Sequence, residues 1–580
     1  MRQLALRPRL LAVAMMAGLV PGLAPGLVLG ADMPGTPGTP SGALLRDNQD
    51  PSAIARQSGQ VAELPPGEEL ERRGAVVGHI DVAVDDIFDV SDPRENRALY
   101  RLANKLHLDT KDTTVLSQVL FQTGDTYSVR QAEETARILR EKRYLYDAVV
   151  EPTAYDPETN TVDLLVRVRD VWSLSPGFGV GRSGGENKTR ARIVDENFLG
   201  RGQYLAVGYT STVDRSGISL DFRDQNLFRS WWAMNAGYTD SSDGSTVNLA
   251  VGRPFFSLDT RWSAGMNVLT NEQITPLYDL GEKVDEFRQE SDLFGIQGGW
   301  SRGLIDGWTT RWLTGFRYDR SRFEESFEDV PTVLLPEDRT LSYPWVGVEL
   351  IQDRFETTHN QDQIGRTEDV YLGKTLRLEL GWTADAFGGD RSAGIFGLTG
   401  RLGNYVGERG LVFVESFWNG RLESGSLADS LLSTEARYYL RFNDKNVFTA
   451  AVEGQHGFDL DIDHQLLLGG DTGLRGYPLR YQGGDTRALI SVEERYFTDW
   501  FPFRLARVGG AIFADVGRTW GEAPLASEPQ GWLTDVGFGL RLGNARSGLG
   551  NVLHIDLAFP IGASSDISSM QVLLEAKKTF

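Results

Sequence analysis

The sequence predicts a transmembrane β-barrel that is preceded by one small α+β domain. Three observations predict this fold class. From residue 171 to 580 the chain shows almost no helical periodicity, and apolar and polar residues alternate in many segments. Past the first 31 residues, no apolar run approaches the roughly 18 residues that a membrane helix needs. The strands of a membrane barrel instead alternate apolar and polar residues, and they are joined by short turns on one side and longer loops on the other. This chain shows both features.

The composition narrows the function classes. The 580 residues include 65 glycines and no cysteine, and the formal net charge is −21. An acidic chain lacks the basic footprint of a nucleic-acid-binding protein. The absence of cysteine excludes thiolate metal sites, a cysteine nucleophile and disulfides. Many glycines together with many aromatic residues are typical of a membrane barrel, and a large secreted all-β enzyme is the competing interpretation.

The N-terminus carries an export signal. Arg2, Arg7 and Arg9 precede an apolar run from residue 10 to 20, and small residues precede a cleavage position ahead of Ala31. This pattern predicts a secretory signal peptide over residues 1–30. Residues 31–75 are rich in Pro, Gly and Ala without periodicity, which predicts a flexible leader.

Residues 76–170 have the pattern of a small α+β domain. Alternation predicts a strand at 76–82, and helical spacing predicts helices over 96–106, from Thr113 and from Ser128. Ser128 and Gln131 have the spacing of a capping box. Two alternating segments, 144–155 and 161–170, predict a β-hairpin. The expected order is therefore strand, two helices, strand, strand.

Residues 171–580 are expected to form the barrel. Clear alternation occurs at 434–442, 508–517 and 535–542, although a soluble sandwich has the same alternation. The connections favour the barrel: those at 407–410 and 443–446 are short, whereas 270–292 and 320–342 look like long polar loops. The chain ends on Phe580, and the residues two, four and more positions before it are mostly apolar.

One loop carries the most specific pattern. Residues 466–485 read LLLGGDTGLRGYPLRYQGGD, with Leu474, Arg475, Gly476 and Tyr477 at the centre. Here the chain resembles the BamA/TamA superfamily of outer-membrane assembly and secretion proteins. The turn at 197–202, the segment 513–517 and the five strands after the loop fit this resemblance. The order of elements at 76–170, with Leu-Phe-Gln-Thr-Gly-Asp at 120–125, resembles a polypeptide-transport-associated (POTRA) repeat.

The resemblance implies residue roles. The loop would fold back into the barrel lumen, where Arg475 would pair with carboxylates, and Phe580 would end a C-terminal β-signal. Alternation alone places Glu493 and Asp515 on the lumen side, so these two carboxylates are the expected partners. Arginine suits this role because its guanidinium makes two parallel hydrogen bonds to a carboxylate.

The family resemblance and the alternation pattern give different numbers of barrel strands. The family barrel has 16 strands, whereas the pattern gives 15 candidate strands before the loop and five after it. We expect about 16 antiparallel strands and at most 20. This chain has a single POTRA-like domain, whereas the assembly proteins have more than one such domain. The identity of the client polypeptide is therefore not predicted.

The resemblance implies an outer-membrane protein, with its N-terminal domain in the periplasm, that assembles, inserts or translocates polypeptides. The domain would capture unfolded outer-membrane or secreted chains by adding a strand to a sheet edge, or would act only as a spacer. Clients would pass to a seam between the first strand (172–182) and the last (570–579). The lipid bilayer and periplasmic accessory proteins are the other expected partners. The alternatives are a translocator of one partner protein and a passive channel or structural barrel.

No enzyme, cofactor or metal site is expected. Residues 181–185 match Gly-x-Ser-x-Gly, but a nucleophile elbow requires a helix after the serine, and the pattern there predicts a hairpin loop. The six histidines (79, 107, 359, 456, 464 and 554) show no metal-ligand spacing. Asp459, Asp461 and Asp463 alternate at a strand end and are expected to form a solvated acidic edge rather than a cation site.

Overall fold

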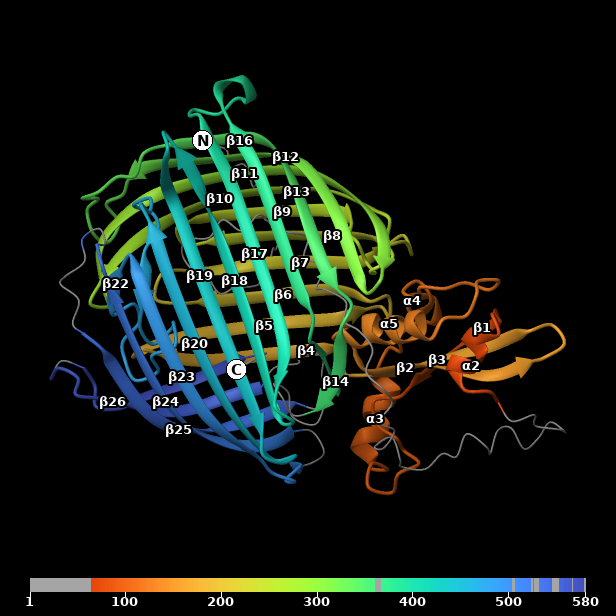
Figure 1. Ribbon diagram of the computed structural model, residues 1–580. Helices are drawn as coiled ribbons and strands as arrows, with labels where there is room; N and C mark the ends of the chain where they lie inside the picture. Colours follow the sequence, from red (N-terminus) through yellow and green to blue (C-terminus); the bar gives the residue numbers. More distant parts are fainter. Residues whose placement is uncertain are drawn as a thin grey trace, which may run out of the picture.

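The computed structural model describes residues 64–359, 367–502, 506–522, 525, 531–544, 552–565 and 567–577. The predicted signal peptide (1–30), most of the predicted leader and Phe580 lie outside these residues. Within them the chain forms one small α+β unit and one large barrel (Figure 1). No helix of the described residues is long and apolar enough to cross a membrane.

The α+β unit contains a three-stranded sheet in the order β1-β3-β2. Strand β1 (Val76–Asp85) is parallel to β3 (Thr161–Asp170), and β2 (Leu145–Asp156) is antiparallel to β3. Between β1 and β2 lie α3 (Ala98–Leu106), α4 (Asp112–Leu116) and α5 (Val129–Arg140). The predicted sequence of strand, helices, strand, strand is confirmed, but three helices rather than two lie between β1 and β2. The capping box is wrong, because the Ser128 side chain makes no capping hydrogen bond and α5 begins on the backbone bond from the Ala132 N–H to the Ser128 carbonyl.

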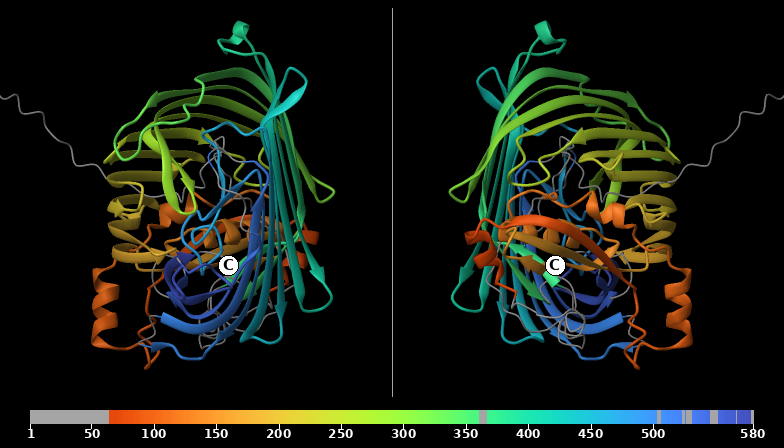
Figure 2. Two further views of the ribbon diagram at one scale, coloured as in Figure 1. Left: turned by 90° about the vertical axis from the view of Figure 1, so that its left-hand side faces the viewer. Right: turned by 90° about the vertical axis from the view of Figure 1, so that its right-hand side faces the viewer.

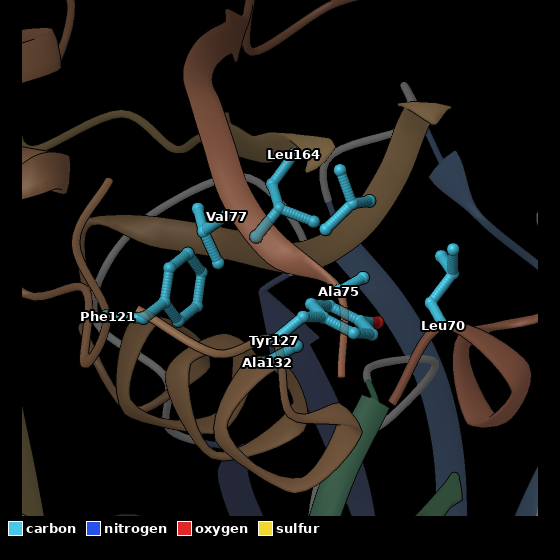
Figure 3. Close-up of a cluster of buried hydrophobic side chains, with 8 residues drawn as sticks. Leu70, Ala75, Val77, Phe121, Tyr127, Ala132 and Leu164 are labelled. Carbon is cyan, nitrogen blue, oxygen red and sulfur yellow. The ribbon is translucent and has the colours of Figure 1, made fainter. Parts of the chain in front are cut away.

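A core of buried side chains lies between the sheet and α5 (Figure 3). Val162 and Leu164 of β3 contribute to it, and Ala132 gives α5 a small residue for close packing. Leu70, from helix α2 (Gly67–Arg72), is fully buried in the same core. The predicted leader of 31–75 is therefore wrong at its C-terminal end, since burying one leucine side chain contributes about 2 kcal/mol and ties this helix to the unit.

Among the described residues, twenty antiparallel strands form the closed barrel. The fifteen before the loop are β4 (Leu174–Ser183), β5 (Glu186–Phe198), β6 (Gln203–Ser211), β7 (Ser216–Leu227), β8 (Trp232–Ser241), β9 (Gly244–Arg253), β10 (Trp262–Asp279), β11 (Glu282–Ile305), β12 (Trp308–Glu325), β13 (Arg339–Gln352), β16 (Lys374–Thr383), β17 (Ala393–Val406), β18 (Gly410–Glu423), β19 (Ser426–Arg441) and β20 (Asn446–Phe458). The five after it are β23 (Thr486–Phe497), β24 (Ala506–Trp520), β25 (Leu533–Asn544), β26 (Val552–Ile561) and β27 (Gln571–Lys577). The fold class is confirmed, and the strand number is the 20 of the alternation pattern rather than the 16 of the resemblance.

The two faces of the barrel wall differ in polarity. Outward positions carry exposed apolar side chains, such as Ile512, Phe538 and Leu540, while their sequence neighbours Phe513 and Arg541 are buried on the inner face. Exposed tryptophans (232, 262, 300 and 308) lie close to the ends of their strands, at the rim where the α+β unit lies, which we call the domain-side rim. An apolar band with an aromatic girdle is the surface that a bilayer covers.

The connections correct one prediction. The segments 407–410 and 443–446 are tight turns as expected, but 270–292 is not a loop, because β10 and β11 continue through it to a two-residue turn at 280–281. The 18 residues of β10 and 24 of β11 exceed the 9–11 residues that span a bilayer. Their polar outer halves extend beyond it at the rim opposite the domain, the far rim. The segment 320–342 is likewise strand at both ends, with a loop at 326–338.

The turn at 197–202 binds the α+β unit to the barrel. Its Gly200 carbonyl accepts hydrogen bonds from the Lys111 N–H and the Thr114 hydroxyl, at 3.0 Å each, and Asn197 donates to Thr110 Oγ1 at 2.8 Å. Gly200 has φ +70°, and a Cβ there would lie 2.3 Å from the carbonyl oxygen of Asp109. This turn requires glycine because the domain lies directly against it.

Helix α5 makes a second set of contacts with the barrel. Its Glu134 accepts a hydrogen bond from the Leu258 N–H at 3.0 Å. Its Arg140 donates to both carboxylate oxygens of Asp369, at 2.9 and 2.7 Å. Asp369 lies on a hairpin of β14 (Phe355–His359) and β15 (Thr367–Tyr371), which connects β13 to β16 on this rim. These buried and half-buried bonds fix the unit against the barrel end (Figure 2).

Candidate functional site

The loop between β20 and β23 folds into the barrel. Its two short strands, β21 (Leu466–Leu468) and β22 (Gln482–Gly484), pair with each other. Leu474 and Tyr477 are buried in one apolar cluster with Leu489 of β23 and Leu533 of β25. Since the outer face of the wall is apolar and exposed, these contacts place residues 466–485 against the inner face, as the family resemblance implied.

Arg475 is the centre of the site. Its guanidinium donates to both carboxylate oxygens of Asp515, from Nε at 2.7 Å and from Nη2 at 2.9 Å. Nη1 donates to Glu493 Oε2 at 3.0 Å. The guanidinium carbon also lies 3.3 Å from the centre of the Phe513 ring, a cation–π contact that is strongest when both groups are removed from water. The structure thus brings the three predicted partners together.

The charged network is larger than the predicted triad. Arg541 of β25 donates to both oxygens of Glu493, at 3.2 and 2.9 Å, and also pairs with Asp556 of β26. Arg495 donates to Glu493 Oε1 at 2.9 Å. All of these side chains are buried. Removing one partner from a buried pair costs about 3–5 kcal/mol because the other charge then lacks compensation, so the network holds four strands and the loop in one arrangement.

The residues after Arg475 fix the approach of the loop to the wall. The Gly476 N–H donates to Asp535 Oδ2 at 3.0 Å, and a Cβ at Gly476 would lie 2.6 Å from the Asp535 Cβ. Only glycine therefore allows this contact. The Tyr477 hydroxyl lies 3.3 Å from the Thr534 carbonyl oxygen, to which it donates.

The sequence missed some members of the site. Asp535 and Arg541 were on the correct face by alternation, but nothing in the sequence linked them to the loop, and Asp556 carried no signal. Register between neighbouring strands decides which inward residues meet, and a single sequence does not contain that register. The functional role assigned to the loop residues Leu474, Arg475, Gly476 and Tyr477 stays a prediction, and Phe580 lies outside the described residues.

The loop also touches the first hairpin of the barrel. The Ser183 hydroxyl donates to the Gly470 carbonyl at 2.7 Å. A Cβ on Gly184 would lie 2.2 Å from the Leu479 backbone nitrogen. The Gly-x-Ser-x-Gly match at 181–185 is thus a tight β4–β5 turn, as predicted, and its serine binds the loop. The loop therefore links the network to the tip of β4.

The aspartates at 459–463 correct another expectation. Asp463 is buried and accepts two hydrogen bonds from Arg339, at 2.9 and 2.7 Å. Asp461 accepts two from Arg421, at 2.9 and 3.0 Å. The predicted solvated acidic edge is wrong for these two residues, because arginines on β13 and β18 face them across the interior.

His464, in the same segment, gives a pH prediction. Burial disfavours its charged form, but the Asp429 and Asp463 carboxylates outweigh burial and raise its pKa to about 8. A raised pKa stabilises the fold fully below the unfolded value near 6.5, and this contribution of about 2 kcal/mol is lost as the pH rises through 8. Urea unfolding in micelles at pH 6 and pH 9 should show this loss in the wild type and not in His464→Gln. Parallel pH profiles for the two proteins would contradict it.

A charged lumen network, an apolar exposed wall and a loop folded inward define a transmembrane barrel whose interior is organised around one arginine. The comparisons with known proteins show which domains parts of this chain resemble. Residues 416–571 match the Omp85 superfamily domain, and residues 107–170 match the POTRA domain described as a surface antigen variable number repeat. Over these two ranges the chain is similar to an Omp85 barrel domain and to a POTRA-type domain ahead of it.

Individual relatives are distant. A protein of Treponema pallidum (strain Nichols), described as a candidate outer membrane protein assembly factor, is 27% identical over 135 residues, which are 22% of this chain and 16% of that protein. BamA from Haemophilus ducreyi lacking POTRA domains 1–3 is 13% identical, with a TM-score of 0.40 over 91% of this chain and 97% of that one. CdiB from Acinetobacter baumannii is 13% identical, with a TM-score of 0.43 over 86% of this chain and 73% of that one.

Proposed function

We propose that this protein assembles, inserts or translocates polypeptides at the outer membrane, with the α+β domain in the periplasm and a seam between β4 and β27 as the place where clients pair. The family matches support the general role. The observation that carries the proposal is the weak pairing of the seam.

Within the described residues, which end at Lys577, the seam has fewer paired residues than the neighbouring strand pairs. Among the described residues, one directly opposed pair, Arg182 with Leu574, joins β4 to β27. Ten such pairs join β4 to β5, and seven join β26 to β27. Strand edges that lack partners are costly in lipid because no water can satisfy their backbone groups. A poorly paired seam therefore offers a template to an incoming strand.

The sequence of β4 makes this strand suited to opening. Pro176 has no N–H to donate, and proline within sheets is confined mainly to edges. Gly177, Gly179 and Gly181 follow at alternate positions on one face. Without side chains there, β4 has little to pack against a neighbour, so separating it from β27 costs less than separating two ordinary strands.

The domain has a place for an extended client. The order β1-β3-β2 leaves β1 and β2 as the outer strands. The first part of β1 is covered, since the Val77 N–H donates to the Asp125 carbonyl and the Gly124 N–H to the Val77 carbonyl. The rest of the two outer strands supports capture by strand addition. The contacts of α5 and the 197–202 turn then keep a captured chain at the barrel end where β4 begins.

Depletion of the protein followed by a quantitative outer-membrane proteome tests the role. Broad loss of barrel proteins is the expected result and indicates assembly. Loss of one surface protein would indicate a translocator for a single partner, and an unchanged proteome would contradict a client role and indicate a channel or structural barrel. Re-expression of the wild type is the control, and it must restore the proteome.

A further inference from the structure

Helix α3 presents an apolar face that the rest of the chain does not cover. Leu99 is 66% exposed, Leu102 49% and Leu106 63%, and Leu108 just after the helix is 59% exposed. Positions 99, 102 and 106 lie on one side of an α-helix because it turns every 3.6 residues. A contiguous exposed apolar face of this kind marks a contact with a membrane or another molecule.

Cations flank this leucine face. Arg97, Arg101 and Lys105 are all exposed. At 100° per residue, Arg101 and Lys105 lie on the flank beside the leucines, on the side away from the packed residues Tyr100 and Ala103. Leucines on one face with Lys and Arg beside them are the pattern of a helix that lies in the surface of an anionic bilayer. The pattern does not suit an apolar protein groove, which would leave the cations without counter-charges.

Helix α3 packs beside the residues that lead into the first strand of the barrel. Its Tyr100 packs with Phe88, at 4.3 Å between ring centres, and its Ala103 packs on the same cluster with Trp172. Trp172 lies two residues before β4, whose Leu174 faces outward and is exposed. Helix α3 therefore lies close to the start of the barrel wall, and it projects at one edge of the molecule in both views (Figures 1 and 2).

We propose that α3 is a bilayer-binding helix, whose leucines enter the acyl boundary of the inner leaflet and whose cations contact anionic phospholipid headgroups beside β4. The proposal rests on the proposed periplasmic placement of the domain but not on any client. The helix would tie the domain to the membrane on the β4 side, in addition to the protein contacts of α5. The cluster with Trp172 would then transmit any movement of the domain to the first strand of the seam.

The absence of native cysteine allows a direct test on the full chain. Single cysteines at Leu102→Cys and Leu106→Cys carry an environment-sensitive fluorophore, and Glu158→Cys in the exposed β2–β3 turn is the matched control. The protein is reconstituted in vesicles of phosphatidylethanolamine and phosphatidylglycerol. Nitroxide-labelled lipid should quench the probes at 102 and 106 and leave the probe at 158 unchanged, and aqueous acrylamide should show the reverse order.

Two further results would overturn the proposal. Equal acrylamide quenching at all three positions would mean that the helix stays in water. Protection from acrylamide without quenching by labelled lipid would mean that a second copy or another part of the chain covers the leucines. Both results leave the depletion experiment unaffected, so the two proposals fail separately.

A second experiment varies the charge of the lipid and of α3 to test the headgroup contacts. Each Lys or Arg near an anionic surface strengthens binding about fivefold. Exchange of phosphatidylglycerol for phosphatidylcholine, or the variant Arg97→Glu/Arg101→Glu/Lys105→Glu in the original vesicles, should therefore lower the lipid quenching at 102 strongly. Quenching that is independent of both changes would contradict the role of the cations.

Discussion

Replacing Arg475 by alanine is expected to leave a barrel that matures poorly and has lost most of its function. The substitution removes three hydrogen bonds and leaves Asp515 and part of the charge of Glu493 without their cation. A buried carboxylate without its partner costs about 3–5 kcal/mol. The loop would then be free to leave the wall, and its contact with the tip of β4 through Ser183 would weaken as well.

The Arg475→Lys variant should be impaired less. Lysine keeps the charge but offers a point-like ammonium that does not reproduce the paired bonds to Asp515. The measurement is the fraction of heat-modifiable, folded barrel in the outer membrane, together with complementation of a depleted strain. Arg401→Ala is the matched control, because Arg401 and Glu415 form an exposed pair, whose loss costs about 1 kcal/mol or less. Wild-type behaviour of both Arg475 variants would reject the role of the loop.

Locking the seam should stop client passage reversibly. Arg182 and Leu574 are directly opposed on β4 and β27. Directly opposed residues of antiparallel strands have Cα atoms about 4.5–5.5 Å apart, which is within the range of a disulfide. The variant Arg182→Cys/Leu574→Cys should lose client insertion almost completely when oxidised and regain it under reductant, as measured in a reconstituted insertion assay.

The control for the lock is a disulfide elsewhere in the wall. Ser219→Cys/Thr239→Cys joins opposed residues of β7 and β8, strands that have no role in the seam. Oxidation of this pair should leave insertion unchanged. Full activity of the oxidised seam variant would show that β4 and β27 need not separate.

Much of the barrel followed from period-2 alternation. Each spanning strand must present one face to lipid and one to the lumen, so the alternation pattern gave 20 candidate strands, which is the number found in the barrel, while the family resemblance suggested 16. The long strands β10 and β11 were missed as strands at 270–292 because this segment is rich in polar residues, although Ile274, Leu277 and Phe287 within it are buried. Helix α2 was missed for a related reason, since a single buried residue, Leu70, holds a short polar helix in the core.

For the candidate site, alternation predicted which face of a strand a residue lies on, but not which residues meet across strands. Glu493 and Asp515 were placed on the lumen side and were joined to Arg475 only through the family resemblance. The contact between Asp556 and Arg541 could not be predicted, because it depends on the register of β25 with β26, which long-range pairing fixes. The pairing of Asp463 with Arg339 was missed likewise, since the two residues are 124 positions apart.

The most direct measurement of the central claim is crosslinking from the seam to a client during insertion. A photo-crosslinking residue at Arg182 or Leu574 should capture the terminal strand of a barrel client, whereas the same residue at Thr239, on the remote β8, should not. This outcome would show that the client pairs at the open edge of β4 and β27. Clients that are inserted normally, with no crosslink at either seam position or with equal crosslinking at Thr239, would contradict it.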